Sequence, residues 1–221
     1  MTDAHFHRGG YATFLALDGE ERRFWGLHPW EADSSPLDIA ALRAKLENDP
    51  GAGVGEIGLD RLKSREISGA QRAAFEGQLQ LAAEMRRPVV LHGAKCWGEV
   101  VKGCIPFAGR VPAFMFHGFS RSVGLLPEMF AMNGFVSIGP ALLNDHAVNY
   151  RAMAAGLPLE KILVETDAEW NDVASHEAQI RAIVERLARL RDVPVDSLAD
   201  SLSANLARFL GASSPELQNA K

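Results

Sequence analysis

The chain has 221 residues, of which 47% are hydrophobic, and it carries a formal net charge of −5 at pH 7. That length can bury one sizeable core, and the hydrophobic content is ordinary for a globular protein. The acidic balance argues against a tight, stable nucleic-acid complex, which would need many lysine and arginine contacts to phosphate.

The sequence also indicates where in the cell the protein is expected to be. No apolar run approaches the length of a membrane span, and the N-terminus lacks the basic and apolar regions of a secretion signal, so we expect no membrane partner. Two cysteines, Cys96 and Cys104, are too few for a disulfide framework. We therefore expect two buried thiols and a cytoplasmic location.

The first fifty residues lack regular alternation between strands and helices. In "DAHFH" at 3–7, His5 and His7 are two residues apart, so in a strand both side chains point to one face. The stretch "YATFLALDGEERRFWGLHPW" at 11–30 predicts an antiparallel hairpin, because a parallel crossover needs a dozen or more residues. The first helix is expected only at 36–48, and whether residues 11–18 form a strand of the main sheet is left open.

From residue 50 onward, short apolar runs alternate with amphipathic segments, which predicts repeated βα units and a parallel sheet. The expected strands are 53–60, 88–92, 111–117, 134–139 and 161–167. Amphipathic helices are expected at 71–86, 175–191 and about 196–209. No linker, repeat or low-complexity segment interrupts the pattern, so residues 1–221 are predicted to form one domain.

The stretch "GVGEIG" at 53–58 satisfies the G-x-G-x-x-G pattern of dinucleotide-binding proteins. That motif needs a helix to open at its third glycine, whereas here the next helix is expected only near residue 70. We therefore reject the cofactor interpretation. The glycines are interpreted as allowing close backbone packing around a carboxylate at a strand end.

Polar residues recur where predicted strands end, which is where parallel α/β folds collect their chemistry. Four histidines and two carboxylates fall at such ends, and a buried charge is costly unless it is paired or bound to a metal. Glu56 is well placed to bridge two divalent ions. The candidate metal ligands are His5, His7, Glu56, His92, His117 and Asp167.

Other polar residues receive different interpretations. Pro29 favours an extended conformation for His28, which would hold that histidine at a strand tip as a substrate contact or as support for a ligand. Asp3 is expected to orient a histidine from behind the site. His146 and His176 lie in or beside helices and are interpreted as surface residues.

Taken together, these motifs resemble the TatD-like metal-dependent deoxyribonucleases, within the amidohydrolase-type barrels. The resemblance spans residues 3–211 and rests on "DAHFH", "GLHPW", "GEIGLD", "QRAAFEGQLQLAAEMRRPVVLH", "HGFS", "VETDAEW" and "NLARFLG". It implies an α/β fold, a distorted TIM (β/α) barrel with a shortened N-terminal part that lacks the first one or two helices. It also implies hydrolysis of phosphodiester bonds, typically the exonucleolytic removal of nucleotides from DNA.

The resemblance further implies a centre of two divalent ions, with Zn, Mn or Mg as the candidate metals. One ion would be held by His5, His7, Glu56 and Asp167, and the other by Glu56, His92 and His117. Asp167 would also act as general base, so Asp167 and Glu56 are the expected catalytic residues.

The chain departs from the family pattern around the expected substrate. Ala94 stands where the family usually has arginine, and Lys95 beside it could replace the missing phosphate contact. Arg121 stands where glycine is common and adds a basic group, while Glu169 stands in place of a common proline. We therefore expect His28, Lys95 and Arg121 to bind substrate.

The leading hypothesis is a divalent-metal-dependent phosphodiesterase or deoxyribonuclease acting on DNA or another phosphodiester. The alternative keeps the metal centre but acts on an amide, ester or lactone. A third possibility is a binding or scaffold protein without activity, which the intact ligand set disfavours. The natural substrate, the metal and the oligomeric state are left open.

Overall fold

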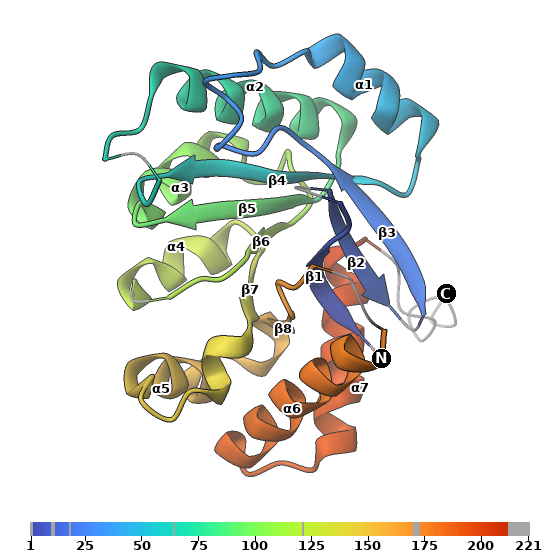
Figure 1. Ribbon diagram of the computed structural model, residues 1–221, viewed down its shortest axis with the longest axis vertical. Helices are drawn as coiled ribbons and strands as arrows, with labels where there is room; N and C mark the ends of the chain where they lie inside the picture. Colours follow the sequence, from blue (N-terminus) through green and yellow to red (C-terminus); the bar gives the residue numbers. More distant parts are fainter. Residues whose placement is uncertain are drawn as a thin grey trace.

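In the computed structural model, eight strands form a single sheet in which each strand pairs with its neighbour in sequence (Figure 1). The structure describes residues 2–9, 12–17, 19–63, 65–120, 122–169 and 173–211, with only the backbone at 173 and 174. The strands are β1 (Asp3–His7), β2 (Thr13–Leu17), β3 (Glu20–Trp25), β4 (Gly53–Asp60), β5 (Val89–Ala94), β6 (Phe114–Phe116), β7 (Gly134–Ile138) and β8 (Ile162–Val164).

The segment after β8 returns to β1 and nearly closes the sheet into a barrel. The backbone N–H of Asp167 donates to the carbonyl of His5 over 3.0 Å, and that of His7 donates to the carbonyl of Ala168 over 2.9 Å. A parallel bridge between His7 and Glu169 continues the contact. This closure places the two ends of the motif-bearing sequence beside each other.

The N-terminal part accounts for the distortion of the barrel. β1 pairs with β2, and β2 with β3, in antiparallel orientation, whereas every pair from β3 to β8 is parallel. The predicted hairpin is therefore confirmed, and residues 13–17 lie in the barrel wall. No helix separates β1 from β2 or β2 from β3 in the described part of the chain, as expected for a barrel lacking its first two helices.

The helices follow the strands from β3 onward and cover the outside of the sheet (Figure 1). They are α1 (Ile39–Asn48), α2 (Gly69–Met85), α3 (Trp97–Cys104), α4 (Leu126–Ala131), α5 (Val148–Gly156), α6 (Val173–Arg191) and α7 (Val195–Phe209). Short 3-10 helices occupy Ile105–Phe107, Val123–Leu125, Pro140–Leu143 and Leu159–Lys161. The predicted start of the first helix at residue 36 is wrong, because Asp38 caps α1 by accepting the N–H of Ala41.

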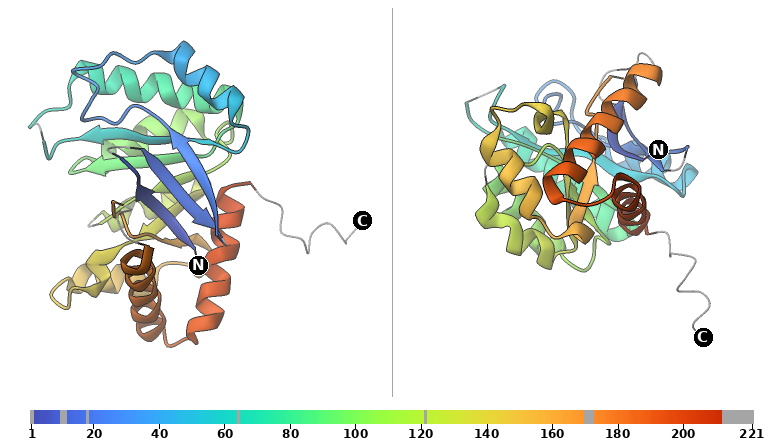
Figure 2. Two further views of the ribbon diagram at one scale, coloured as in Figure 1. Left: turned by 45° about the vertical axis from the view of Figure 1, so that its right-hand side comes forward. Right: turned by 90° about the horizontal axis from the view of Figure 1, so that it is seen from below.

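The inside of the barrel is apolar and is covered at one end by α7. Leu206 and Phe209 of α7 join the cluster formed by inward-facing strand residues, and the ring of Phe209 stacks on Phe24 with centroids 5.9 Å apart. α7 contacts β2 and β8, and Figure 2 shows this C-terminal helix beside the N-terminal strands. Phe209 also lies near the residues that precede β4, β5 and β6. The amino ends of the strands are therefore covered, and the carboxyl ends remain for a site.

Glycine allows β4 to approach β5 closely. Gly58 has φ +153°, and a Cβ there would lie 2.0 Å from the carbonyl oxygen of His92. Because β4 continues to Asp60, no helix opens at Gly58, which agrees with the rejection of the dinucleotide motif. Both cysteines are free and buried as predicted, and no helix among the described residues is long and apolar enough to span a membrane.

Candidate metal centre

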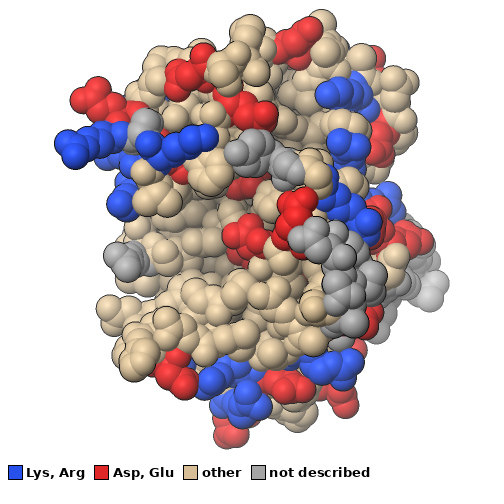
Figure 3. Space-filling model, in the orientation of Figure 1, with Lys and Arg blue, Asp and Glu red and all other residues tan. Residues whose placement is uncertain are grey.

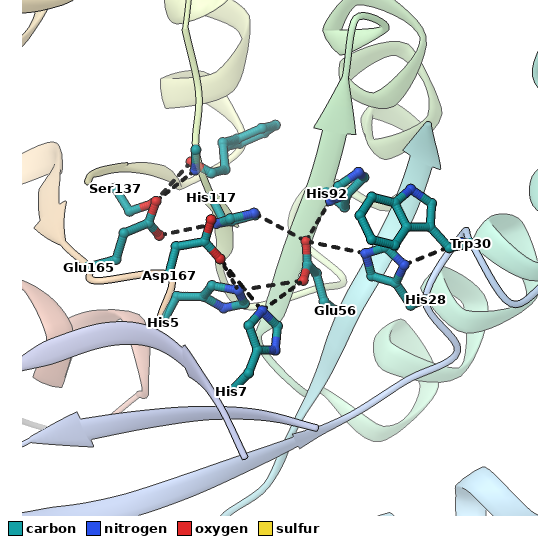
Figure 4. A network of polar contacts seen from close by, with 12 residues as sticks. His5, His7, His28, Trp30, Glu56, His92, His117, Ser137, Glu165 and Asp167 are labelled. Atoms are coloured by element: carbon teal, nitrogen blue, oxygen red, sulfur yellow. Dashed lines mark hydrogen bonds and ion pairs between the residues drawn. The ribbon is translucent and has the colours of Figure 1, made fainter. Parts of the chain in front are cut away.

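The six predicted ligands come from five places in the sheet and meet at the carboxyl ends of its strands (Figure 4). Alternation along β1 turns His5 and His7 to the same face. Glu56 lies within β4 and His92 within β5. His117 directly follows β6, whereas Asp167 lies beyond the end of β8 at Val164, after Glu165 and Thr166.

The first set of ligand atoms surrounds a space with the dimensions of a coordinated cation. Nε2 of His5 lies 3.5 Å from Glu56 Oε2 and 3.7 Å from Asp167 Oδ1, and Nε2 of His7 lies 3.9 Å and 3.5 Å from the same atoms. Ligands about 2.0–2.2 Å from one tetrahedral ion stand roughly 3.4 Å apart. The four atoms fit this spacing, although they are too far apart for good hydrogen bonds.

The environment of His5 supports the same interpretation. Its side chain has no exposed surface, and neither ring nitrogen has a hydrogen-bond partner among the described residues. An unsatisfied buried polar group costs about 1–3 kcal/mol. A cation bound to Nε2 would satisfy one of these nitrogens, so the residues present fit a metal ion.

The second set of ligands meets the other oxygen of Glu56. Oε1 lies 2.7 Å from Nδ1 of His92 and 3.2 Å from Nε2 of His117. Both contacts are short enough for Glu56 to pair directly with each histidine, so this set fits a cation by its donor chemistry rather than by its spacing. Glu56 thus directs one oxygen to each group of histidines, as a bridging carboxylate does.

Two further carboxylates, which the sequence analysis did not single out, hold the outer nitrogens of this second set. Nε2 of His92 lies 2.9 Å from Asp60, and Nδ1 of His117 lies 3.3 Å from Glu165. A ligand histidine commonly donates its second N–H to a carboxylate, which fixes the orientation of its ring. Strand alternation was the available signal, because Asp60 shares a face of β4 with Glu56.

The carboxylates give the centre a strong negative potential. Burial lowers the pKa of His117, but the charges of Glu56 and Glu165 outweigh burial and raise that pKa to about 10. Burial raises the pKa of Asp60, but the hydrogen bonds from His92 and from the N–H of Lys63 hold it well below its usual range. A site of this potential favours a cation.

His28 lies at the edge of the centre, with Nε2 3.8 Å from Glu56 Oε1. Burial lowers its pKa to about 4, so the ring is neutral at pH 7. Its Nδ1 accepts the backbone N–H of Trp30 over 3.2 Å, which assigns the ring proton to Nε2. His28 also forms, with Glu56 and His92, a group whose ligand atoms lie within 4.8 Å of one another, so its role as a substrate contact stays a prediction.

Asp3 braces the backbone behind the centre. Its Oδ1 accepts the N–H groups of His5 and Thr166, each over 3.1 Å, and its Oδ2 accepts the hydroxyl of Thr166 over 2.7 Å. The histidine that its side chain contacts is His176, with Nε2 2.7 Å from Oδ2. Asp3 therefore supports the chain around His5 and Asp167, and the ring that it contacts is not that of a predicted ligand.

The prediction that His176 lies on the surface is wrong, whereas His146 is exposed as expected. α6 lays His176 against the seam between β1 and the segment after β8, with its ring 5.2 Å from that of Phe6. Its side chain is only 6% exposed.

The remaining residues that were expected near the substrate differ in their positions. Lys95 is exposed directly after β5, while Arg121 lies outside the described residues. Glu169 accepts the N–H of Gly9 over 2.8 Å, so its carboxylate fastens the turn after β1. Asp167 is 46% exposed and lines a cavity of about 450 Å³. Reactants can therefore reach this carboxylate.

The chain is similar to known hydrolases. The family model described as TatD related DNase matches residues 16–211. A "3'-5' ssDNA/RNA exonuclease TatD" from Edwardsiella piscicida is 29% identical over 150 residues, which are 66% of this chain and 56% of that relative. An "Uncharacterized metal-dependent hydrolase YcfH" from Escherichia coli K12 is 24% identical over 221 residues, which are 96% of this chain and 83% of that relative.

Solved structures show the same architecture. The crystal structure of YJJV, a TatD homologue from Escherichia coli K12, superposes with a TM-score of 0.71 at 25% identity, covering 86% of this chain and 76% of that one. A TatD family hydrolase from Entamoeba histolytica superposes with a TM-score of 0.72 at 12% identity, covering 86% and 74% of the two chains. The second likeness supports the fold alone.

Proposed function

This chain belongs to the TatD related DNase family, and from that premise we propose that it acts as a single domain that hydrolyses phosphodiester bonds in nucleic acid with two divalent ions. The observation that carries the proposal is the position of Glu56, whose two oxygens face two groups of histidines. The chain spans only 56% of the length of the TatD exonuclease that it resembles, so the substrate stays part of the proposal.

The ligand assignment follows the contacts. His5, His7, Glu56 and Asp167 would hold one ion, and Glu56, His92 and His117 the other. When bound, such ions would neutralise charge developing on the phosphoryl oxygens and make water more acidic. Imidazole and carboxylate together suit Zn or Mn, and Mg less well.

The protein's own groups complete the reaction. Asp167 is the exposed carboxylate of the centre and can accept a proton from the attacking water. His28 can donate a hydrogen bond from Nε2 to a phosphoryl oxygen. Asp3 and Thr166 hold the backbone beside Asp167, which limits its movement.

A second candidate function keeps the same centre but uses an amide, ester or lactone as substrate. The feature that favours it is the cavity beside Asp167, which has no lysine or arginine among its described lining residues. A neutral substrate would bind there without a cationic partner.

An assay across substrate classes distinguishes the two candidates. The protein reconstituted with Mn²⁺ or Zn²⁺ is offered single-stranded DNA, RNA and a panel of esters, lactones and amides, with Asp167→Asn as the matched control. We expect cleavage of DNA or RNA that Asp167→Asn abolishes. Turnover of an amide or lactone with DNA and RNA untouched would favour the second function, and stoichiometric metal without any hydrolysis would favour a binding protein.

The location is also part of this proposal. Cys96 and Cys104 are free and buried, which suits a reducing compartment. We therefore propose that the protein acts in the cytoplasm.

A further inference from the structure

The loop that follows β4 carries three cationic side chains beside the metal centre. Arg61, Lys63 and Arg65 are exposed there, and exposed Lys95 follows β5 directly. The N–H of Arg61 donates to the carbonyl of Ala94 over 2.9 Å, so the two loops lie side by side. These four residues, Arg61, Lys63, Arg65 and Lys95, are called the basic rim below.

Asp60 fastens the basic rim to the metal centre. Its Oδ1 accepts the N–H groups of Leu62 and Lys63, each over 2.7 Å, while its Oδ2 lies 2.9 Å from Nε2 of His92. One buried carboxylate therefore fixes both a predicted ligand and the start of the loop. The backbone at the start of the loop is therefore held in a defined place relative to the centre.

The ammonium group of Lys63 contacts an aromatic ring beside the centre. Its Nζ lies 5.0 Å from the centroid of the Trp30 ring, a distance typical of a cation–π contact. The Trp30 ring lies 4.9 Å from the ring of His28 and 6.1 Å from that of His92. A single aromatic ring therefore separates the charge of Lys63 from the histidines of the centre.

Most of the charge on the basic rim is not neutralised by protein. Arg61 pairs with Glu99 over 2.6 Å. Within the described ranges, however, no carboxylate lies at ion-pair distance from Lys63, Arg65 or Lys95. Cations without a carboxylate partner beside the centre are available to the phosphates of a substrate.

The two sides of the centre differ in charge. The cavity of about 450 Å³ beside Asp167 continues, through shared residues such as Ser120 and Tyr150, into one of about 940 Å³ beside His146. The described residues that line these cavities include no lysine or arginine. Figure 3 shows blue side chains overhanging one edge of the hollow and red side chains near the centre of the face.

We propose that the basic rim binds the phosphates that flank the scissile bond of a single-stranded polynucleotide, so that the strand extends over β4 and β5. The nucleoside on the other side of the bond then occupies the two cavities, whose described lining includes no cationic lysine or arginine. Trp30 and Leu62 are 36% and 61% exposed on the rim side and offer apolar surface to unpaired bases, which a duplex would hide. This inference rests on the proposed function, because it assigns the substrate of the same centre.

A DNA-binding assay tests the role of the basic rim without requiring hydrolysis of the DNA. The Mn²⁺-loaded protein is titrated into a fluorescent, phosphorothioate-linked DNA 12-mer, which resists hydrolysis, and fluorescence anisotropy gives Kd at several salt concentrations. In the double variant Lys63→Glu/Lys95→Glu, we expect Kd to rise at least tenfold. The slope of log K against log salt should fall by roughly 1.4, since each single-strand phosphate contact contributes about 0.7.

A matched double variant controls for net charge. Lys102 on α3 and Arg189 on α6 are exposed, so Lys102→Glu/Arg189→Glu makes the same charge change away from the rim. We expect its Kd and salt slope to stay within twofold of wild type. The proposed role of the basic rim would be refuted if the rim variant and wild type had equal Kd values and salt slopes. It would also be refuted if both double variants lost the same affinity for the DNA.

Hydrolysis of bis(4-nitrophenyl) phosphate separates this inference from the proposed function. That diester has one phosphate and no flanking chain, so the variant Lys63→Glu/Arg65→Glu, which keeps Lys95, should cleave it at the wild-type rate. An equal loss on the diester would contradict a role for the rim in flanking contacts. A wild-type protein that leaves both the diester and natural DNA intact would refute the proposed function, while the rim is still judged by the anisotropy titration.

Discussion

Oε1 of Glu56 lies 2.7 Å from Nδ1 of His92, a contact that joins β4 to β5 inside the ligand cluster. The second oxygen of the same carboxylate faces His5 and His7. Glu56 is therefore the residue that contacts both groups of histidines, and its replacement should weaken metal binding at both positions.

Glu56→Gln keeps the size of the side chain but removes its charge, so it should lower the affinity for Mn²⁺ or Zn²⁺ at both positions. We expect bound metal, measured by inductively coupled plasma mass spectrometry after dialysis against micromolar metal, to fall at least tenfold. Glu47→Gln, an exposed change on α1, is the matched control. Unchanged metal content in Glu56→Gln would show that Glu56 is not a metal ligand.

Glu165→Gln tests the carboxylate behind His117. Loss of the partner that orients a ligand histidine typically weakens metal binding about 10–100-fold. We therefore expect a weaker affinity with the fold retained, checked by competition with a chelating dye and by circular dichroism. An affinity equal to that of Glu47→Gln would show that Glu165 does not position His117.

Asp3→Asn should destabilise the closed barrel. The buried carboxylate of Asp3 accepts three hydrogen bonds and contacts His176, and breaking such a network costs about 2–4 kcal/mol. We expect a loss of that order in the free energy of unfolding in urea, compared with Asp200→Asn on the exposed face of α7. Equal stabilities of the two variants would refute the bracing role.

Removal of metal should lower thermal stability. A ligand at 100 times its Kd stabilises a native protein by about 2.7 kcal/mol, which corresponds to roughly 5–10 °C in Tm for a chain of this size. We expect chelation to lower Tm by this amount and added Mn²⁺ or Zn²⁺ to restore it. His5→Ala should fold cooperatively with a smaller metal-dependent shift, and cooperative unfolding of His5→Ala with full metal retention would contradict its assignment.

The sequence indicated which side chains would meet because a strand end is a local feature. His92 and His117 close apolar runs, and Glu56 and Asp167 interrupt or follow others, so the parallel arrangement of strands was enough to bring them together. The missing helices were also predictable, because too few residues separate the first strands for a crossover.

What the sequence did not indicate depends on packing between distant segments. His176 appears as a surface residue in its helix pattern, and only the approach of α6 to β1 places it beside Asp3. The pairing of Glu165 with His117 joins segments 48 residues apart. The basic rim was missed for the same reason, since the contact between Lys63 and Trp30 depends on how two loops fold over the centre.

Anomalous diffraction from crystals grown with Mn²⁺ tests the central claim most directly, because it locates bound metal without reference to activity. We predict two peaks that share Glu56, one against His5, His7 and Asp167 and the other against His92 and His117. The absence of anomalous density among these six side chains at saturating Mn²⁺, or ordered Mn²⁺ bound only elsewhere, would contradict the metal centre on which the proposed hydrolysis depends.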